Sequence, residues 1–239
     1  TAGYSFTCRG IISTASNTRA IYLRTSTVTL TTTSDESATS FGNLGTLTFD
    51  AGTSTIVCTG AANKRVGSAS TTSSLTFYNV TTTDAGSLTL DGINVFNSVT
   101  VGRTTIGRAI LNTNNNQTIG TLNLNGNSPT QRVTFSSTIR NTQRTITLSS
   151  FGTSINCDFE DIAITGAATN ASITRAGNLG GNSGITFPAA KTVYWNLSGT
   201  NAFTANGWAS SSGGTPDVNN FPLAQDIAIV NNSSAGTGL

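Results

Sequence analysis

Residues 75–96, LTFYNVTTTDAGSLTLDGINVF, carry the pattern that decides the fold class. Two triplets in it alternate apolar and polar residues, Leu75-Thr76-Phe77 and Leu88-Thr89-Leu90, and the turn formers Asp84-Ala85-Gly86 separate them. Alternation with a period of two is the signature of a β-strand with one buried face. The same triplet recurs as Val28-Thr29-Leu30, Leu47-Thr48-Phe49, Leu122-Asn123-Leu124, Val133-Thr134-Phe135 and Ile146-Thr147-Leu148. The sequence therefore predicts an all-β protein.

Two features favour a right-handed parallel β-solenoid (β-helix) over tandem β-sandwiches, the alternative fold. The predicted strands are short, and their outward residues are mostly Thr, Ser and Asn, which can stack into ladders along a coil axis. Residues 4–10 (YSFTCRG) also resemble residues 54–60 (STIVCTG), as if each opened a repeated block. Asp91-Gly92 argues the other way, because this dipeptide between two strand patterns is a hairpin signal. A hairpin there would favour the sandwiches.

The composition changes near residue 190. Both tryptophans and three of the four prolines lie from Pro188 onward. Such a shift marks a boundary. We expect a β-solenoid over residues 1–190, followed over residues 191–239 by a small C-terminal β subdomain, a cap or the start of a further β module. Because the first residues already have a strand pattern, we expect the chain to be a piece of a longer protein.

Charge and composition argue against several classes of function. Lys and Arg number 12, Asp and Glu number 10, and His is absent from the 239 residues. Scattered arginines leave no basic stripe for nucleic acid, and no run of about 18 apolar residues could insert into a membrane. Nucleophilic catalysis with a histidine base is excluded. We expect no enzyme activity, no cofactor and no metal.

The three cysteines, Cys8, Cys58 and Cys157, are widely separated, so they form no metal-binding motif. At most one disulfide could link them. The simpler interpretation is that they are free, buried thiols that pack as small apolar side chains. The cysteines are compatible with an oxidising or a reducing compartment.

Residues 157–187, with KTVYW at 191–195, GWA at 207–209, SSGG at 211–214 and NFPLAQD at 220–226, resemble a module of large tailed-bacteriophage virion proteins and related bacterial surface proteins. The Thr-rich triplets before them resemble the filamentous-haemagglutinin type of β-helix. The resemblance implies a phage virion structural protein, a tail fibre, spike or decoration component with a role in host-surface attachment. The resemblance implies that the protein is part of a virion, or is extracellular or on a cell surface. It identifies no catalytic residues.

The expected partners are copies of the chain itself and other virion proteins. The open ends of a solenoid pair strands indiscriminately, so a cap, a neighbouring domain or oligomerisation must cover them. We therefore expect a homo-oligomer, such as a trimer. A bacterial surface adhesin of haemagglutinin or autotransporter type would share the fold and is the second functional hypothesis.

A carbohydrate-cleaving tailspike is the third hypothesis, and it requires a pair of carboxyl groups. Asp158, Glu160 and Asp161 form the densest acidic cluster. In a strand, Asp158 and Glu160 would share a face about 7 Å apart. The favoured alternative is a solvated strand face with Phe159 in the core. Arg140 and Arg144 are candidate bases for a lyase, although outward arginines more often bind neighbouring coils.

Aromatic residues near the C-terminus give a candidate carbohydrate-binding site. Tyr194, Trp195 and Trp208 lie among asparagines, and this mixture lets a protein stack on sugar rings while it binds their hydroxyls. A host-surface glycan would be the ligand. The favoured alternative is that the tryptophans form the small core of the C-terminal segment, because few other large residues lie there.

Overall fold

The computed structural model describes residues 3–31, 39–42, 44–60, 62–68, 70, 72–82, 86–102, 109–197 and 201–230. Within these residues the protein is all-β. It has two short 3₁₀ helices, η1 (Leu44–Thr46) and η2 (Val218–Asn220), and no α-helix in the described ranges. The prediction of an all-β protein is confirmed.

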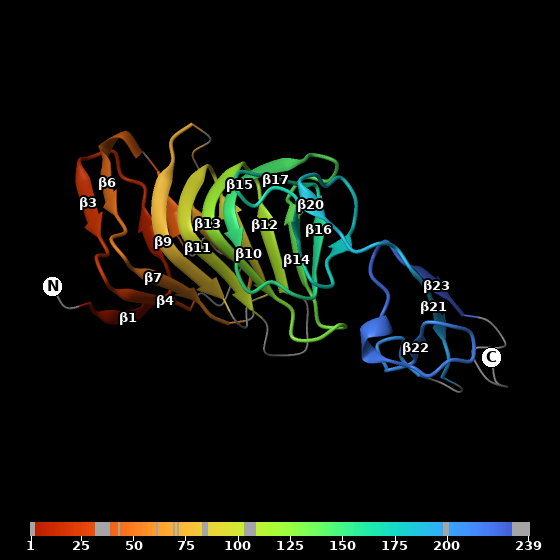
Figure 1. Ribbon diagram of the computed structural model, residues 1–239. Helices are drawn as coiled ribbons and strands as arrows, with labels where there is room; N and C mark the ends of the chain where they lie inside the picture. Colours follow the sequence, from red (N-terminus) through yellow and green to blue (C-terminus); the bar gives the residue numbers. More distant parts are fainter. Residues whose placement is uncertain are drawn as a thin grey trace.

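Two long sheets build most of the molecule (Figure 1). The larger one, called the first sheet, contains in spatial order β1 (Ser5–Cys8), β4 (Thr27–Leu30), β7 (Thr55–Cys58), β9 (Leu75–Thr82), β11 (Asn94–Gly102), β13 (Gln117–Asn125), β15 (Arg144–Phe151) and β17 (Ile162–Thr165). The second sheet contains β19 (Gly177–Asn178), β16 (Cys157–Glu160), β14 (Val133–Ser137), β12 (Ala109–Thr113), β10 (Ser87–Asp91) and β8 (Lys64–Gly67).

The chain visits the two sheets in turn from β8 to β17, so each strand pairs with the strand two places away in sequence. All ladders between named strands in both sheets are parallel. Three smaller parallel pairs add to them: β2 (Ile11–Ser13) with β5 (Thr39–Phe41), β3 (Arg19–Tyr22) with β6 (Leu47–Asp50), and β18 (Ala171–Ser172) with β20 (Ile185–Thr186). This pairing is compatible with a solenoid, whereas β-sandwiches are antiparallel.

The predicted strand triplets are confirmed, since all seven lie in strands. The two similar segments also occupy equivalent places. Residues 5–8 pair with β4, and β4 pairs in register with residues 55–58, so that Cys8, Leu30 and Cys58 align. The repeat seen in the sequence therefore corresponds to positions two strands apart in the first sheet.

Asp91-Gly92 does not form a hairpin. Strand β10 before it belongs to the second sheet, and β11 after it belongs to the first. Gly92 has φ +75°, and a Cβ built on it would lie 1.9 Å from the Ser68 carbonyl oxygen. Glycine is needed here because the chain passes closely over a neighbouring turn between sheets. In the other predicted turn, Asp84-Ala85-Gly86, Asp84 and Ala85 lie outside the described residues.

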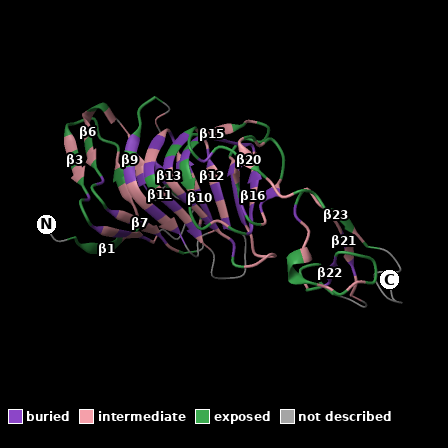
Figure 2. Cartoon of the chain, in the orientation of Figure 1, coloured by how far each residue is buried: buried purple, intermediate pink, exposed green. Residues whose placement is uncertain are grey.

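The inward residues of successive strands stack on their own kind. The rings of Phe49, Phe77 and Phe96 follow one another at centroid separations of 5.2 and 5.3 Å, and Phe77 and Phe96 are stacked with 15° between their planes. In the second sheet, the rings of Phe135 and Phe159, both fully buried, lie 6.3 Å apart with 58° between their planes. Figure 2 shows the alternation of buried and less buried residues along the strands. This packing supplies a continuous apolar core.

The outward polar residues form the predicted ladders. Ser98 Oγ donates to Asn79 Oδ1 at 2.7 Å, and Asn123 Nδ2 donates to Thr100 Oγ1 at 3.0 Å. Such contacts between neighbouring strands link residues that lie 19 and 23 positions apart in the chain. The hydroxyl and amide groups therefore bond to each other along the sheet and also face solvent.

The C-terminal segment forms a smaller lobe beyond the end of the two sheets (Figure 1). Its sheet places β21 (Thr192–Trp195) between β22 (Trp208–Ala209) and β23 (Ile227–Ile229). Gln225 Oε1 accepts a hydrogen bond from the backbone N–H of Asn178, in the edge strand β19, at 2.9 Å. Its buried residues form a cluster separate from the main core.

Candidate functional site

Two of the three carboxylates proposed for a tailspike, those of Asp158 and Glu160, are bound by arginines that precede them in the chain. Asp158 makes a two-point ion pair with Arg132, with Nε to Oδ2 at 2.8 Å and Nη2 to Oδ1 at 2.7 Å. Both side chains are largely buried, at 10% and 14% exposure. Arg132 Nη2 also donates to the carbonyl oxygen of Arg175 at 2.7 Å. Arg132 precedes β14, Asp158 lies in β16 and Arg175 precedes β19. This guanidinium therefore joins segments at three neighbouring strands of the second sheet.

The other two acidic residues have similar contacts. Glu160 Oε1 accepts from Arg140 Nε at 3.2 Å, and Asp161 Oδ2 accepts from the backbone N–H of Asn141 at 2.7 Å. Phe159, between Asp158 and Glu160, is fully buried as predicted, but the strand face beside it is not the solvated one expected, since the Asp158 and Glu160 side chains are 14% and 27% exposed. Arg140 therefore binds a neighbouring carboxylate, and the acidic cluster serves as a set of ties between turns.

The predicted carbohydrate site at Tyr194, Trp195 and Trp208 does not form a stacking surface. Trp195 and Trp208 are each 4% exposed, their ring centroids are 5.2 Å apart, and Val193 completes their cluster. Trp208 Nε1 donates to the Phe203 carbonyl oxygen at 2.9 Å. Tyr194 is half-buried and, as the strand neighbour of Trp195, faces the opposite side. The tryptophans form the small core of this segment, as the favoured alternative predicted.

A different group of residues forms a hollow on the outer surface of the first sheet. Strands β9, β11, β13 and β15 bend at one equivalent residue each: Tyr78, Asn97, Gly120 and Ser149, called here the corner row. The register pairs Phe77 with Phe96 and Ile119 on one side of the bend, and Asn79 with Ser98 and Thr121 on the other. At the bend two consecutive residues, such as Tyr78 and Asn79, separate the inward-facing Phe77 and Val80. Regular alternation would place only one residue there.

A longer turn closes one end of the corner row. The ring of Phe49 lies against that of Phe77, and Thr55 pairs with Asn79, so residues 50–54 occupy the place that Tyr78 alone fills on the next strand. Asp50 Oδ1 accepts from the Gly52 N–H at 2.8 Å and holds this turn. The extra residues make a wall beside the corner row.

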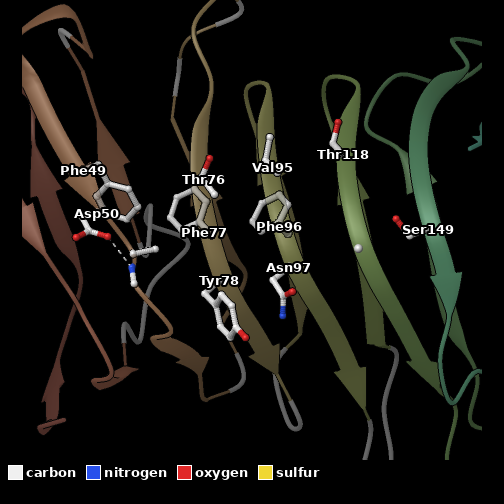
Figure 3. A pocket seen from close by; sticks show the side chains of 13 residues that line it. Phe49, Asp50, Thr76, Phe77, Tyr78, Val95, Phe96, Asn97, Thr118 and Ser149 are labelled. Carbon is white, nitrogen blue, oxygen red and sulfur yellow. Dashed lines mark hydrogen bonds between the residues drawn. The ribbon is translucent and has the colours of Figure 1, made fainter. Parts of the chain in front are cut away.

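The wall and the corner row enclose a hollow of about 610 Å³, called here the outer hollow. Its exposed lining side chains are polar, and they include Thr76, Asn97, Thr118 and Ser149. Figure 3 shows the side chains of Tyr78 and Asn97 lying next to each other on adjacent strands, beyond the rings of Phe77 and Phe96. The volume is in the usual range for a small-molecule site.

Glycine at position 120 helps to form the outer hollow. A Cβ on Gly120 would lie 2.5 Å from the carbonyl oxygen of Asn97. The close approach of the two strands therefore excludes a side chain, and its absence leaves room between Asn97 and Ser149. A second hollow of about 460 Å³ also begins at Ser149 and extends past Phe151.

The corner row was not predicted from the sequence, although the sequence contains a signal for it. The segments FYNV, FNSV, IGTL and LSSF, at residues 77–80, 96–99, 119–122 and 148–151, each place two residues between apolar positions. This interrupts the period-two alternation at the same point of four strands. Such a shared phase shift predicts a bend, and residues at a bend can line a groove.

The buried thiols give a test of the core. Burial raises the pKa of Cys58 to about 12 and that of Cys157 to about 12. At pH 8 only about one thiol in 10,000 would then be the reactive thiolate. We expect a thiol reagent such as DTNB to leave Cys58 and Cys157 unmodified in the native protein, as peptide mass mapping would show. Both should react in guanidinium, and rapid native modification of either would contradict their burial.

All three cysteines are free, as the simpler interpretation predicted. Among the described residues, no helix is long and apolar enough to cross a bilayer. No protein-family model, curated protein or solved structure matches the chain.

Proposed function

We propose that this chain is a right-handed parallel β-solenoid and a structural component of a phage virion, a tail fibre, spike or decoration protein with a role in host-surface attachment. The observation that carries the proposal is the parallel pairing of eight strands in one sheet, visited in alternation with a second parallel sheet. The right hand follows from the strong general preference of parallel crossover connections.

The contacts between turns support a structural role. The Phe77 and Phe96 rings stack, polar side chains such as Ser98 and Asn79 bond between neighbouring strands, and Arg132 joins three turns. Each turn is therefore tied to its neighbours through apolar, polar and ionic contacts at once. A stack of this kind grows in one direction and makes a stiff rod, which is what a fibre or spike requires.

The N-terminal end of the stack supports assembly with copies of itself or other virion proteins. Strand β1 is the last strand of the first sheet at that end, and Tyr4 is 74% exposed. Ile12 and Tyr22 nearby are 72% and 55% exposed. Exposed apolar side chains grouped in this way are typical of a surface that contacts another protein. The opposite end already meets the C-terminal lobe through Gln225.

Immunogold electron microscopy tests the location. An antibody raised against the purified chain would be applied to virions and to cells of the source culture. We expect gold particles on the virion exterior, with rod-like density in cryo-electron micrographs whose strands cross the rod axis about 4.8 Å apart. Label on the surface of uninfected bacteria would favour the adhesin instead, and label confined to the cell interior would overturn the proposal.

A further inference from the structure

We infer that the outer hollow binds a neutral oligosaccharide, with the ring of Tyr78 as the stacking platform. The inference rests on the attachment role proposed above, because it names the ligand through which attachment would occur. It places the site at the bend of the first sheet and not at Tyr194, Trp195 and Trp208.

The aromatic contact comes from Tyr78. Its ring is half-buried and stands beside the wall of residues 50–54, whereas the rings of Phe77 and Phe96 behind it are 1% exposed. Tyr78 therefore offers apolar surface to a ligand while the surrounding core stays closed. A planar ring with a polar end suits a sugar, which has an apolar face and a hydroxylated rim.

Hydrogen-bonding groups lie along the hollow, from Asn97 on the strand next to Tyr78 to Ser149 three strands away. The hydroxyls of Thr76, Thr118 and Ser149 and the amide of Asn97 are all exposed in the lining. The Asn97 Nδ2 donates to Asn79 Oδ1 at 3.1 Å, which orients the amide without burying it. Because hydroxyls both donate and accept, they match the mixed donor and acceptor rim of a sugar.

The charge of the lining favours a neutral ligand. Among the described residues around the outer hollow, Asp50 is the one charged side chain, and no Lys or Arg accompanies it. An anionic ligand, such as a nucleic acid or an acidic glycan, would find no cation and would meet the carboxylate. The exposed polar side chains of Thr76, Asn97, Thr118 and Ser149 interrupt the apolar surface of Phe49, Tyr78 and Val95, so the lining suits a ligand with both apolar and polar faces.

A peptide fits less well than a sugar. Extended peptides bind to sheets chiefly by adding a strand to an open edge. Strands β9, β11, β13 and β15 are each paired on both sides, so none has a free edge at the hollow. A ligand in the hollow would therefore be recognised by side chains, including the polar ones of the corner row, and not by backbone pairing.

The hollow is long enough for several sugar units. The corner row crosses four adjacent strands, which at about 4.8 Å per spacing covers roughly 14 Å. The second hollow continues from Ser149 towards Phe151. A linear oligosaccharide could therefore lie along the row, with one end against the wall that contains Asp50.

The test is an array of oligosaccharides probed with the purified chain. Neutral hexose and N-acetylhexosamine oligomers would be printed beside sialylated and uronate-containing ones, and the best ligand would then be titrated by calorimetry. We expect neutral oligomers to be retained and Tyr78→Ala to weaken the best of them about tenfold or more. Asn97→Ala should also weaken binding, whereas Tyr78→Phe should keep most of the affinity.

Tyr194→Ala is the matched control, because Tyr194 is half-buried like Tyr78 and does not line the hollow. Its affinity should equal that of the unmodified chain, and circular dichroism should show native folding of each variant. A native Tyr78→Ala variant with unchanged affinity would overturn the inference, as would a preference for acidic glycans or retention of no glycan. If the glycan test fails in one of these ways but immunogold labelling places the protein on the virion, the inference about the outer hollow is wrong and the proposed function stands. Label confined to the cell interior refutes the proposed function itself.

Discussion

Replacing Phe77 by alanine is expected to lower the free energy of unfolding by about 3–5 kcal/mol. The ring is 1% exposed and lies between Phe49 and Phe96 at 5.2 and 5.3 Å. Its removal would leave a cavity in a stack whose backbone is fixed on both sides by parallel pairing, so little collapse can fill it. Guanidinium unfolding followed by far-ultraviolet circular dichroism measures the change.

Tyr4→Ala is the control for this prediction, since Tyr4 is an aromatic residue that is 74% exposed. Its change should stay within about 0.5 kcal/mol. Tryptophan fluorescence is unsuitable as the readout, because Trp195 and Trp208 both lie in the C-terminal lobe. Equal midpoints for Phe77→Ala and Tyr4→Ala would contradict the stacked core.

Replacing Arg132 by methionine is expected to lower the free energy of unfolding by about 3 kcal/mol, because it leaves a largely buried carboxylate without its partner. Asp158 is 14% exposed in its side chain and would lose both hydrogen bonds of the ion pair. The carbonyl oxygen of Arg175 would lose a donor as well. Guanidinium unfolding again measures the change.

Arg140→Met is the matched control, because the Arg140 side chain is 83% exposed where it pairs with Glu160. An exposed ion pair contributes about 0–1 kcal/mol, so this variant should be nearly neutral. The double variant Arg132→Met with Asp158→Leu should recover part of the lost stability, since no unpaired charge remains. A loss as small for Arg132→Met as for Arg140→Met would show that the buried tie does not hold the turns together.

Local features of the fold could be predicted from the sequence because they depend on nearby residues. Alternation located the strand at Leu75-Thr76-Phe77, and the position of Phe159 between two acidic residues indicated that its ring points inward. The similarity of residues 4–10 and 54–60 also corresponds to a real structural equivalence. Each of these depends on the side-chain period of a single strand.

The features that the sequence did not reveal depend on contacts between strands. The dipeptide Asp91-Gly92 has the chemistry of a hairpin, yet here Gly92 allows close passage over Ser68. Trp195 and Trp208 are paired across the C-terminal sheet, which turns both rings into the same core. The corner row unites residues from four turns, whose equivalence is visible only once the register is known.

The spacing between equivalent residues explains why no strict repeat is visible. Asn79 bonds to Ser98, 19 positions away, whereas Thr59 bonds to the Leu30 carbonyl oxygen across 29 positions. Insertions such as residues 50–54 lie in turns, and the stacked Phe residues keep their alignment on either side. A search for a fixed period would therefore miss the regularity of the core.

This separation of turns from core has an evolutionary consequence. Because the wall of residues 50–54 is an addition to a turn, mutation can lengthen, shorten or exchange it while the aromatic stack remains the same. Surface loops tolerate such length changes at a modest entropic cost. A lineage under pressure to change what it adheres to could alter the rim of the outer hollow one turn at a time, and the scaffold would need no compensating change.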